Sequence, residues 1–272
     1  MPYVPAPVIE KLGTRRYVLL VSLDEHLSEL TRVTAEIDHF VEWESVYEWL
    51  NIASSIDSLS INTTKNNSSF GWCRDADEYD LARSDLLEIA VKKLSIFNFI
   101  WGALEASIEV IKPPKHPIRE KRGKISDTCY LLKNKFSIHS QLLGLSEETK
   151  AFKDFASQCF GFARVESRLG KYTDYGSSGI GLYAVYELRN LFAHGSLSFP
   201  QPDGENKPQS PFLELVDHAS RIVLMNIQML LLNHLDYDFY EIWHNGDTVQ
   251  LKDVLRTCHL DKDCSPPQMQ LL

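Results

Sequence analysis

The segment RNLFAHG, Arg189 to Gly195, contains the residues of this chain that are best suited to chemistry. It joins a permanent cation, Arg189, to an ionisable imidazole, His194, at a spacing of five residues. An arginine holds the charge of a phosphate while a histidine moves a proton, so this pair has the groups needed to cleave RNA without a metal.

The segment is expected to close a helix that runs from about Ile180 to His194. At 100° per residue, Arg189 falls among the apolar positions of this helix, which are Leu182, Val185, Tyr186, Phe192 and Ala193. A guanidinium on such a face is costly unless it is paired. We therefore expect Arg189 to meet an acidic partner, a cleft or a second subunit; a purely structural ion pair is the alternative. His194 lies at the helix end, where the dipole favours cations, and Gly195 occupies the position of a C-cap glycine.

The rest of the chain predicts an all-α fold. The clearest helix is Asp80 to Ile111, in which apolar residues recur at alternating threes and fours, and Asp75 and Glu78 offer a capping-box-like start. Helical spacing also covers 125–136, 152–163 and 212–235, and the glycine- and serine-rich stretch 176–181 is expected to connect to the motif helix. The N-terminal third is predicted to be helical from about Asp24 to Ile56, and the tail after Asp236 to hold short irregular or strand pieces.

In this setting the chain resembles the HEPN superfamily, whose signature is an arginine, often a following polar residue, and a histidine four to six positions on. Here these residues are Arg189, Asn190 and His194. The resemblance covers roughly residues 80–235 in helix order, and it implies a four- to five-helix bundle that forms a homodimer. It divides the chain into an N-terminal helical extension (1–70), the HEPN-like bundle (71–240) and a C-terminal tail (241–272).

The resemblance also implies a function. Many HEPN proteins are metal-independent endoribonucleases that act as toxins or in antiviral defence, and they leave 2′,3′-cyclic phosphate and 5′-hydroxyl ends. By this likeness His194 transfers a proton, Arg189 holds the phosphate, and Asn190 orients one of these groups, in a cleft at the dimer interface. Some family toxins have a tyrosine two positions after the histidine, where this chain has Ser196. The alternative is a noncatalytic HEPN-like module that binds RNA, a nucleotide or a protein partner.

The net charge of −9 argues against a broad nucleic-acid-binding surface. One basic run stands apart from this balance and is a candidate for steering RNA. Its cationic residues are Lys112, Lys115, Arg119, Lys121, Arg122 and Lys124.

Five scattered cysteines suit free thiols in a reducing cytosol, and no apolar run is long enough for a membrane span. These features favour a cytoplasmic protein. The resemblance implies an RNA substrate, no cofactor, and an antitoxin or other regulatory protein as a possible partner.

Three lesser candidates complete the prediction. Glu105, with Asn98 two turns earlier, lies beside the apolar stripe of its helix and is a possible partner for Arg189. Cys258, His259 and Cys264 cluster near the C-terminus, but their spacing is not that of a zinc site, so no metal is predicted. The tryptophans Trp43, Trp49 and Trp101 are expected to be core aromatics before they are base-stacking surfaces.

Overall fold

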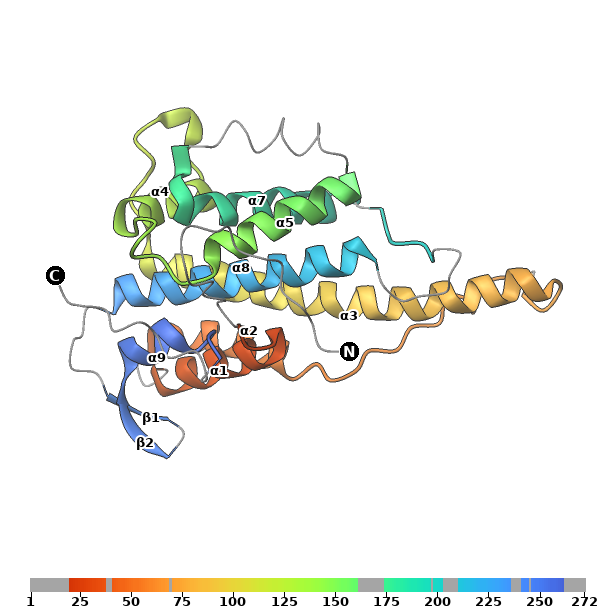
Figure 1. The fold of residues 1–272 in the computed structure, drawn as a ribbon, viewed down its shortest axis with the longest axis horizontal. Coiled ribbons are helices and arrows are strands. Elements are labelled where there is room, and N and C mark those ends of the chain that lie inside the picture. Colours follow the sequence, from red (N-terminus) through yellow and green to blue (C-terminus); the bar gives the residue numbers. More distant parts are fainter. Residues whose placement is uncertain are drawn as a thin grey trace, which may run out of the picture.

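The structure, a computed structural model, describes residues 20–37, 41–68, 70–160, 174–196, 198–202, 210–235, 241–244 and 246–261. Its helices form three layers (Figure 1). The middle layer holds α3 (Arg74–Ile111) and α8 (Pro211–His234). One outer layer consists of α4 (Lys124–Lys135), α5 (Leu145–Phe160) and α7 (Gly176–Ala193), and the other of α1 (Leu23–Ile37), α2 (Glu44–Ser54) and α9 (Leu251–Thr257). The predicted all-α helical bundle is confirmed.

Helix α8 is the centre of the core. Ser210 caps its N-terminus by accepting a hydrogen bond from the Phe212 backbone N–H at 3.3 Å, and Pro211 occupies the first turn, where no intrahelical N–H bond is lost. Every side chain from Ile222 to Leu231 is buried. A helix that is apolar on all sides has to be covered on all sides. Helices α1, α3, α5, α7 and α9 provide this cover.

Two helices, α3 and α8, are long and apolar enough to cross a membrane by length and composition. The apolar stretch of α8 is 83% buried by the rest of the protein and that of α3 is 50% buried. Core helices of a globular protein have this same property, and both helices pack against each other in the middle layer.

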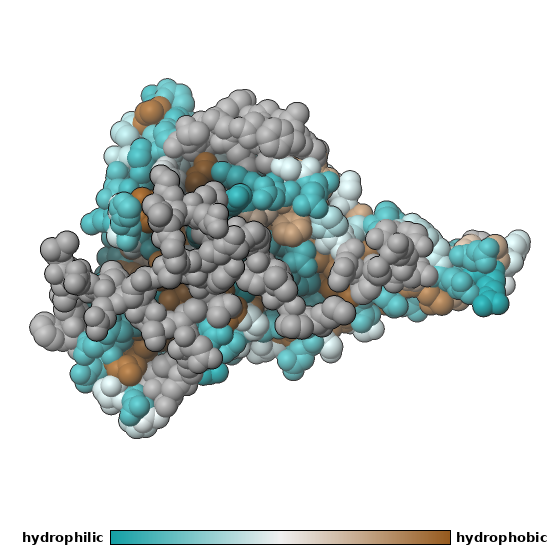
Figure 2. All heavy atoms as spheres, viewed as in Figure 1, coloured by the Kyte–Doolittle hydropathy of each residue, from teal (hydrophilic) through white to brown (hydrophobic). Residues whose placement is uncertain are grey.

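Helix α3 begins six residues before the predicted Asp80, and the predicted capping box does not form. Its N-cap is Cys73, which makes no side-chain capping bond, and Glu78 instead pairs with Arg74 at 2.8 Å. Asp75 and Asp77 in the first turn favour the helix through its dipole, a signal without apolar periodicity. This end of α3 extends past the other helices as a narrow projection (Figures 1 and 2).

Helix α7 begins at Gly176, so the predicted connection 176–181 is wrong, since this stretch is the first part of the helix itself. The reason is close packing. A Cβ atom on Gly179 would lie 2.7 Å from the backbone oxygen of Cys129 in α4, and one on Gly181 would lie 2.5 Å from Oγ1 of Thr149 in α5. The glycines therefore let α7 approach both neighbours. The predicted helix 152–163 corresponds to α5, and its last three residues lie outside the described residues.

The N- and C-terminal segments join the same hydrophobic core. The predicted helical region 24–56 contains two helices, α1 and α2, and the 3₁₀ turn Val41–Trp43 immediately before α2. Strands β1 (Glu241–His244) and β2 (Asp247–Gln250) form an antiparallel hairpin, which agrees with the strand pieces expected after Asp236, whereas α9 was not foreseen. Residues of α1, α2 and α9 lie in one cluster of buried side chains with those of α3 and α8.

The contact between α7 and α4 gives a test of the fold. Replacing Gly179 with alanine places a methyl group against the backbone of α4, and overpacking of this kind costs about 1–3 kcal/mol. We expect Gly179→Ala to lower the free energy of unfolding in urea by this amount. Gly123→Ser is the control, because a Cβ atom there meets no atom within 4 Å. Equal stability of both variants and the unaltered protein would contradict the close approach.

Candidate functional site

The C-terminus of α7 is held in a defined geometry by backbone hydrogen bonds. The Ser196 N–H donates to Leu191 O at 2.8 Å, and the Gly195 N–H donates to Phe192 O at 3.0 Å. Gly195 has a φ of +63°, in the left-handed region that glycine adopts without strain. These bonds are those of a Schellman motif, so the predicted C-cap glycine is confirmed, and His194 is the C-cap residue.

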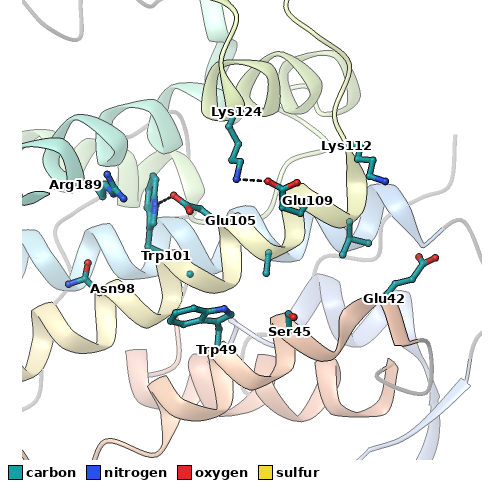
Figure 3. A pocket seen from close by; sticks show the side chains of 13 residues that line it. Glu42, Ser45, Trp49, Asn98, Trp101, Glu105, Glu109, Lys112, Lys124 and Arg189 are labelled. Carbon is teal, nitrogen blue, oxygen red and sulfur yellow. Dashed lines mark hydrogen bonds and ion pairs between the residues drawn. The ribbon is translucent and has the colours of Figure 1, made fainter.

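Arg189 lies one and a half turns before this end, and its side chain lines a cleft of about 740 Å³ (Figure 3). The cleft is lined by α2, α3 and α7, with Lys124 from the start of α4. Arg189 is half-buried, and within the described part of the chain it makes no side-chain hydrogen bond or ion pair. An acidic partner, a cleft or a second subunit was expected around this arginine. Of these three, the structure shows the cleft.

Two aromatic side chains, Trp49 and Trp101, line the cleft. The indole of Trp101 in α3 is only 4% exposed, and it stacks on Tyr186 of α7 with ring centroids 6.3 Å apart. Trp49 of α2 is 40% exposed and lies against Phe99 of α3, with centroids 5.7 Å apart. The expectation of core aromatics is confirmed for Trp43 and Trp101, but it is wrong for Trp49, which lies at the edge of the buried face of α2.

Both predicted partners of Arg189 line the same cleft, yet each bonds elsewhere. Oε1 of Glu105 accepts a hydrogen bond from Nε1 of Trp101 at 2.7 Å, and Nδ2 of Asn98 donates to Leu94 O at 2.8 Å. No ion pair joins Glu105 to Arg189 among the described residues. In Figure 3, Trp101 lies between the two side chains. Glu105 thus orients the indole, and no hydrogen bond or ion pair occupies the Arg189 guanidinium among the described residues.

His194 and Asn190 do not line the cleft. Asn190 is half-buried and His194 is exposed. A separation of five residues places two helical side chains about 140° apart around the axis and about 7.5 Å apart along it. Arg189 and His194 of one protomer therefore leave α7 on different sides, and the structure does not bring them together within a single chain.

The basic run divides between the cleft and the surface. Lys112 and Lys124 line the cleft, and Nζ of Lys124 pairs with Glu109 at 2.6 Å, which lowers the pKa of that carboxyl below its usual range. Lys121 pairs with Asp174, and Nε of Arg122 donates to His116 O at 3.0 Å. Lys115 and Arg119 are exposed outside the cleft. Only the two ends of the run therefore line the cleft that holds Arg189.

Sequence reasoning missed the contribution of α2 to this site. Gly102 faces Trp49, and a Cβ atom at this position would lie 2.6 Å from Cδ2 of the indole ring. A single glycine among bulky residues on a long helix is the signal that a neighbour approaches closely, but it does not reveal which neighbour. Glu42 and Ser45 complete this side of the cleft.

Cys258 and His259 belong to a buried hydrogen-bond network and not to the cleft. His259 Nε2 lies 3.1 Å from Leu143 O, which only accepts, so this nitrogen carries the proton and Nδ1 accepts from Nε2 of Gln228 at 3.2 Å. Oε1 of Gln228 then accepts from Nε2 of His26 at 2.6 Å. This arrangement suits neutral imidazoles and ties α1 and α8 to the segment after α9. Burial raises the pKa of the Cys258 thiol. Cys264 lies outside the described residues.

Comparisons of the chain with protein-family models, with curated proteins and with solved structures give no significant match. The site is therefore judged on its own geometry.

The buried network predicts how stability depends on pH. Burial lowers the pKa of His259 to about 4 and also lowers that of His26. An unfolded histidine titrates near 6.5, so between these values the unfolded chain binds more protons, and stability falls as the pH falls. For His259 alone, we expect a loss of about 2 kcal/mol between pH 6.5 and 5.

Urea unfolding at a series of pH values measures this loss. The variant His259→Gln should show a weaker pH dependence than the unaltered protein, whereas His139→Gln, which changes an exposed histidine, should not. An unchanged pH profile in His259→Gln would show that His259 is not held neutral in the folded state.

Proposed function

We propose that this protein is a metal-independent endoribonuclease of the HEPN type, cytoplasmic, and acting as a toxin or antiviral-defence effector. The observation that supports it most is the state of Arg189. Its guanidinium is half-buried, has no ion pair among the described residues, and lines a cleft of about 740 Å³. Ligand sites usually have a volume of roughly 300–1,000 Å³. Such a guanidinium is costly to keep unless a ligand uses it.

In the proposed reaction, Arg189 binds the phosphate and stabilises the negative charge that builds up on it in the transition state. His194 transfers the proton, either from the ribose 2′-hydroxyl or to the leaving 5′-oxygen. Asn190 orients one of these groups by hydrogen bonding. The products are a 2′,3′-cyclic phosphate end and a 5′-hydroxyl end.

The proposed site is composite and contains two protomers. Because Arg189 and His194 of one chain leave α7 on different sides, the histidine that serves a phosphate on Arg189 comes from a second copy. The exposure of His194 at the end of α7 supports this assignment, since the imidazole is accessible to another protomer. Control of the nuclease would then come from dimerisation or from a separate antitoxin or regulatory protein.

The second candidate is a noncatalytic helical module that binds RNA, a nucleotide or a protein partner. One observation favours it: His194 is absent from the lining of the cleft that holds Arg189. This module needs no proton transfer, so it predicts binding without cleavage.

Cleavage of RNA in the presence of a chelator tests the two candidates. General acid–base catalysis contributes roughly 100-fold or more, so we expect both Arg189→Ala and His194→Ala to lower the cleavage rate by at least about this factor. Arg74→Ala and His139→Ala are matched controls at exposed positions, and they should cleave like the unaltered protein. Full activity in either motif variant would refute the assignment.

Mixing the two inactive variants tests the composite site. A heterodimer of Arg189→Ala with His194→Ala keeps one intact pair if the pair spans two protomers, so the mixture should recover part of the activity. A mixture as inactive as its components would place both groups in one chain.

A further inference from the structure

The cleft that holds Arg189 also contains an exposed aromatic side chain, Trp49, which has no role in the proposed cleavage. Trp49 is large and apolar, yet 40% of its surface is exposed at the cleft, and α3 holds it in place. Gly102 admits the ring against the α3 backbone, and Phe99 contacts it with centroids 5.7 Å apart. An exposed indole that is fixed in this way is a surface on which a planar ring can stack.

Cations lie at the two ends of this cleft. Arg189 is at one end and Lys112 at the other, with Trp49 and Trp101 between them (Figure 3). Lys112 is the C-cap residue of α3 and lies eleven residues after Trp101, which corresponds to about 16.5 Å along the helix axis at 1.5 Å per residue. Within the described part of the chain, neither Lys112 nor Arg189 has an ion pair. The cleft therefore offers two separated phosphate contacts with an aromatic surface between them.

The acidic groups restrict which part of a ligand can lie in the middle. Glu109 forms an ion pair with Lys124, whereas Oε2 of Glu105 has no hydrogen bond among the described residues. A phosphate beside Glu105 would be repelled, whereas the N–H groups on the edge of a nucleobase would be attracted. The charges thus favour a base beside Glu105 and phosphates beside Arg189 and Lys112, where Glu42 at the Lys112 end limits the strength of the second contact.

We propose that this cleft binds a short stretch of single-stranded RNA, with one base stacked on Trp49 and its edge near Glu105, and with two phosphates of the strand, more than one nucleotide apart, on Arg189 and Lys112. This inference rests on the proposed function for the nature of the strand. A base can reach Trp49 and Glu105 only with its face and its Watson–Crick edge free, so the site selects single strands over duplexes.

Binding of a short 2′-O-methyl oligoribonucleotide, followed by fluorescence anisotropy of a labelled strand, tests this site. Cleavage through the 2′-hydroxyl is blocked in this probe, so the readout is independent of catalysis. Stacking of one base on an aromatic side chain contributes about 1–3 kcal/mol, so Trp49→Ala should weaken binding roughly tenfold or more. Trp49→Phe should restore part of the affinity.

Trp72→Ala is the matched control, because Trp72 is 85% exposed and lies just before α3, outside the cleft. It should bind the strand like the unaltered protein. Gly102→Ala keeps the indole but displaces it, and it should weaken binding in the same direction as Trp49→Ala. Lys112→Gln should reduce the dependence of binding on salt, since one phosphate contact is lost. Thermal unfolding of each variant checks that the fold is retained.

Two further ligands, a duplex and a free mononucleotide, test whether the cleft prefers a single strand. A duplex of the same sequence should bind more weakly than the single strand, and so should a free mononucleotide, which lacks the second phosphate contact. The inference is overturned if the unaltered protein does not bind the strand, if Trp49→Ala binds it equally well, or if either of these ligands binds as tightly.

The outcomes also separate this inference from the proposed function. If the strand binds through Trp49 but RNA is not cleaved, the ribonuclease is refuted and the nucleotide site stands. If RNA is cleaved at the same rate with and without Trp49, and the affinity is unchanged, the nucleotide site is refuted and the ribonuclease stands.

Discussion

The burial of α8 is the constraint on which the rest of the structure depends. A helix without a polar face is stable in water only when other helices cover it, so two outer layers and α3 have to pack around it. Polar groups on this helix must then find partners inside the protein. Asn226 donates to Ile222 O at 2.6 Å, and Gln228 connects His26 to His259. Helix α1 and the described residues after α9 are thereby part of the core.

The cleft follows from this arrangement. Helices α2 and α7 lie in opposite outer layers, and both border the long helix α3 (Figure 1). The cleft runs along α3 and is lined by residues from both of these helices. Arg189 enters it from one layer and Trp49 from the other. A guanidinium and an aromatic surface thus come from helices that are more than a hundred residues apart in the chain.

Close backbone contacts set the position of the motif helix. Gly179 and Gly181 allow α7 to approach α4 and α5, and the Schellman motif at Gly195 ends the helix directly after His194. Arg189 lies between these two constraints, with Tyr186 one turn earlier against Trp101. These contacts fix the position on α7 from which the Arg189 side chain extends.

Much of the fold was predictable from apolar periodicity, because apolar residues spaced three and four positions apart identify a helix and its buried face. Helices α4 and α8 begin and end within one residue of the predicted ranges. The start of α3 was not predictable in this way, because its first turns are charged and have no apolar stripe. The start of α7 was missed for another reason: its glycines were interpreted as a connection, and their packing against Cys129 and Thr149 is visible only in three dimensions.

The candidate site divides in the same way. The sequence by itself determined that Arg189 lies on an amphipathic helix, that this helix ends at Gly195, and that a guanidinium there needs a partner or an opening, because these follow from local geometry and from the cost of desolvating a charge. Only the tertiary structure decided that the opening is a cleft, that Glu105 bonds to Trp101 and not to Arg189, and that Trp49 is exposed beside them. Which side chains meet across a cleft depends on how separate helices pack, and no spacing within one helix encodes it.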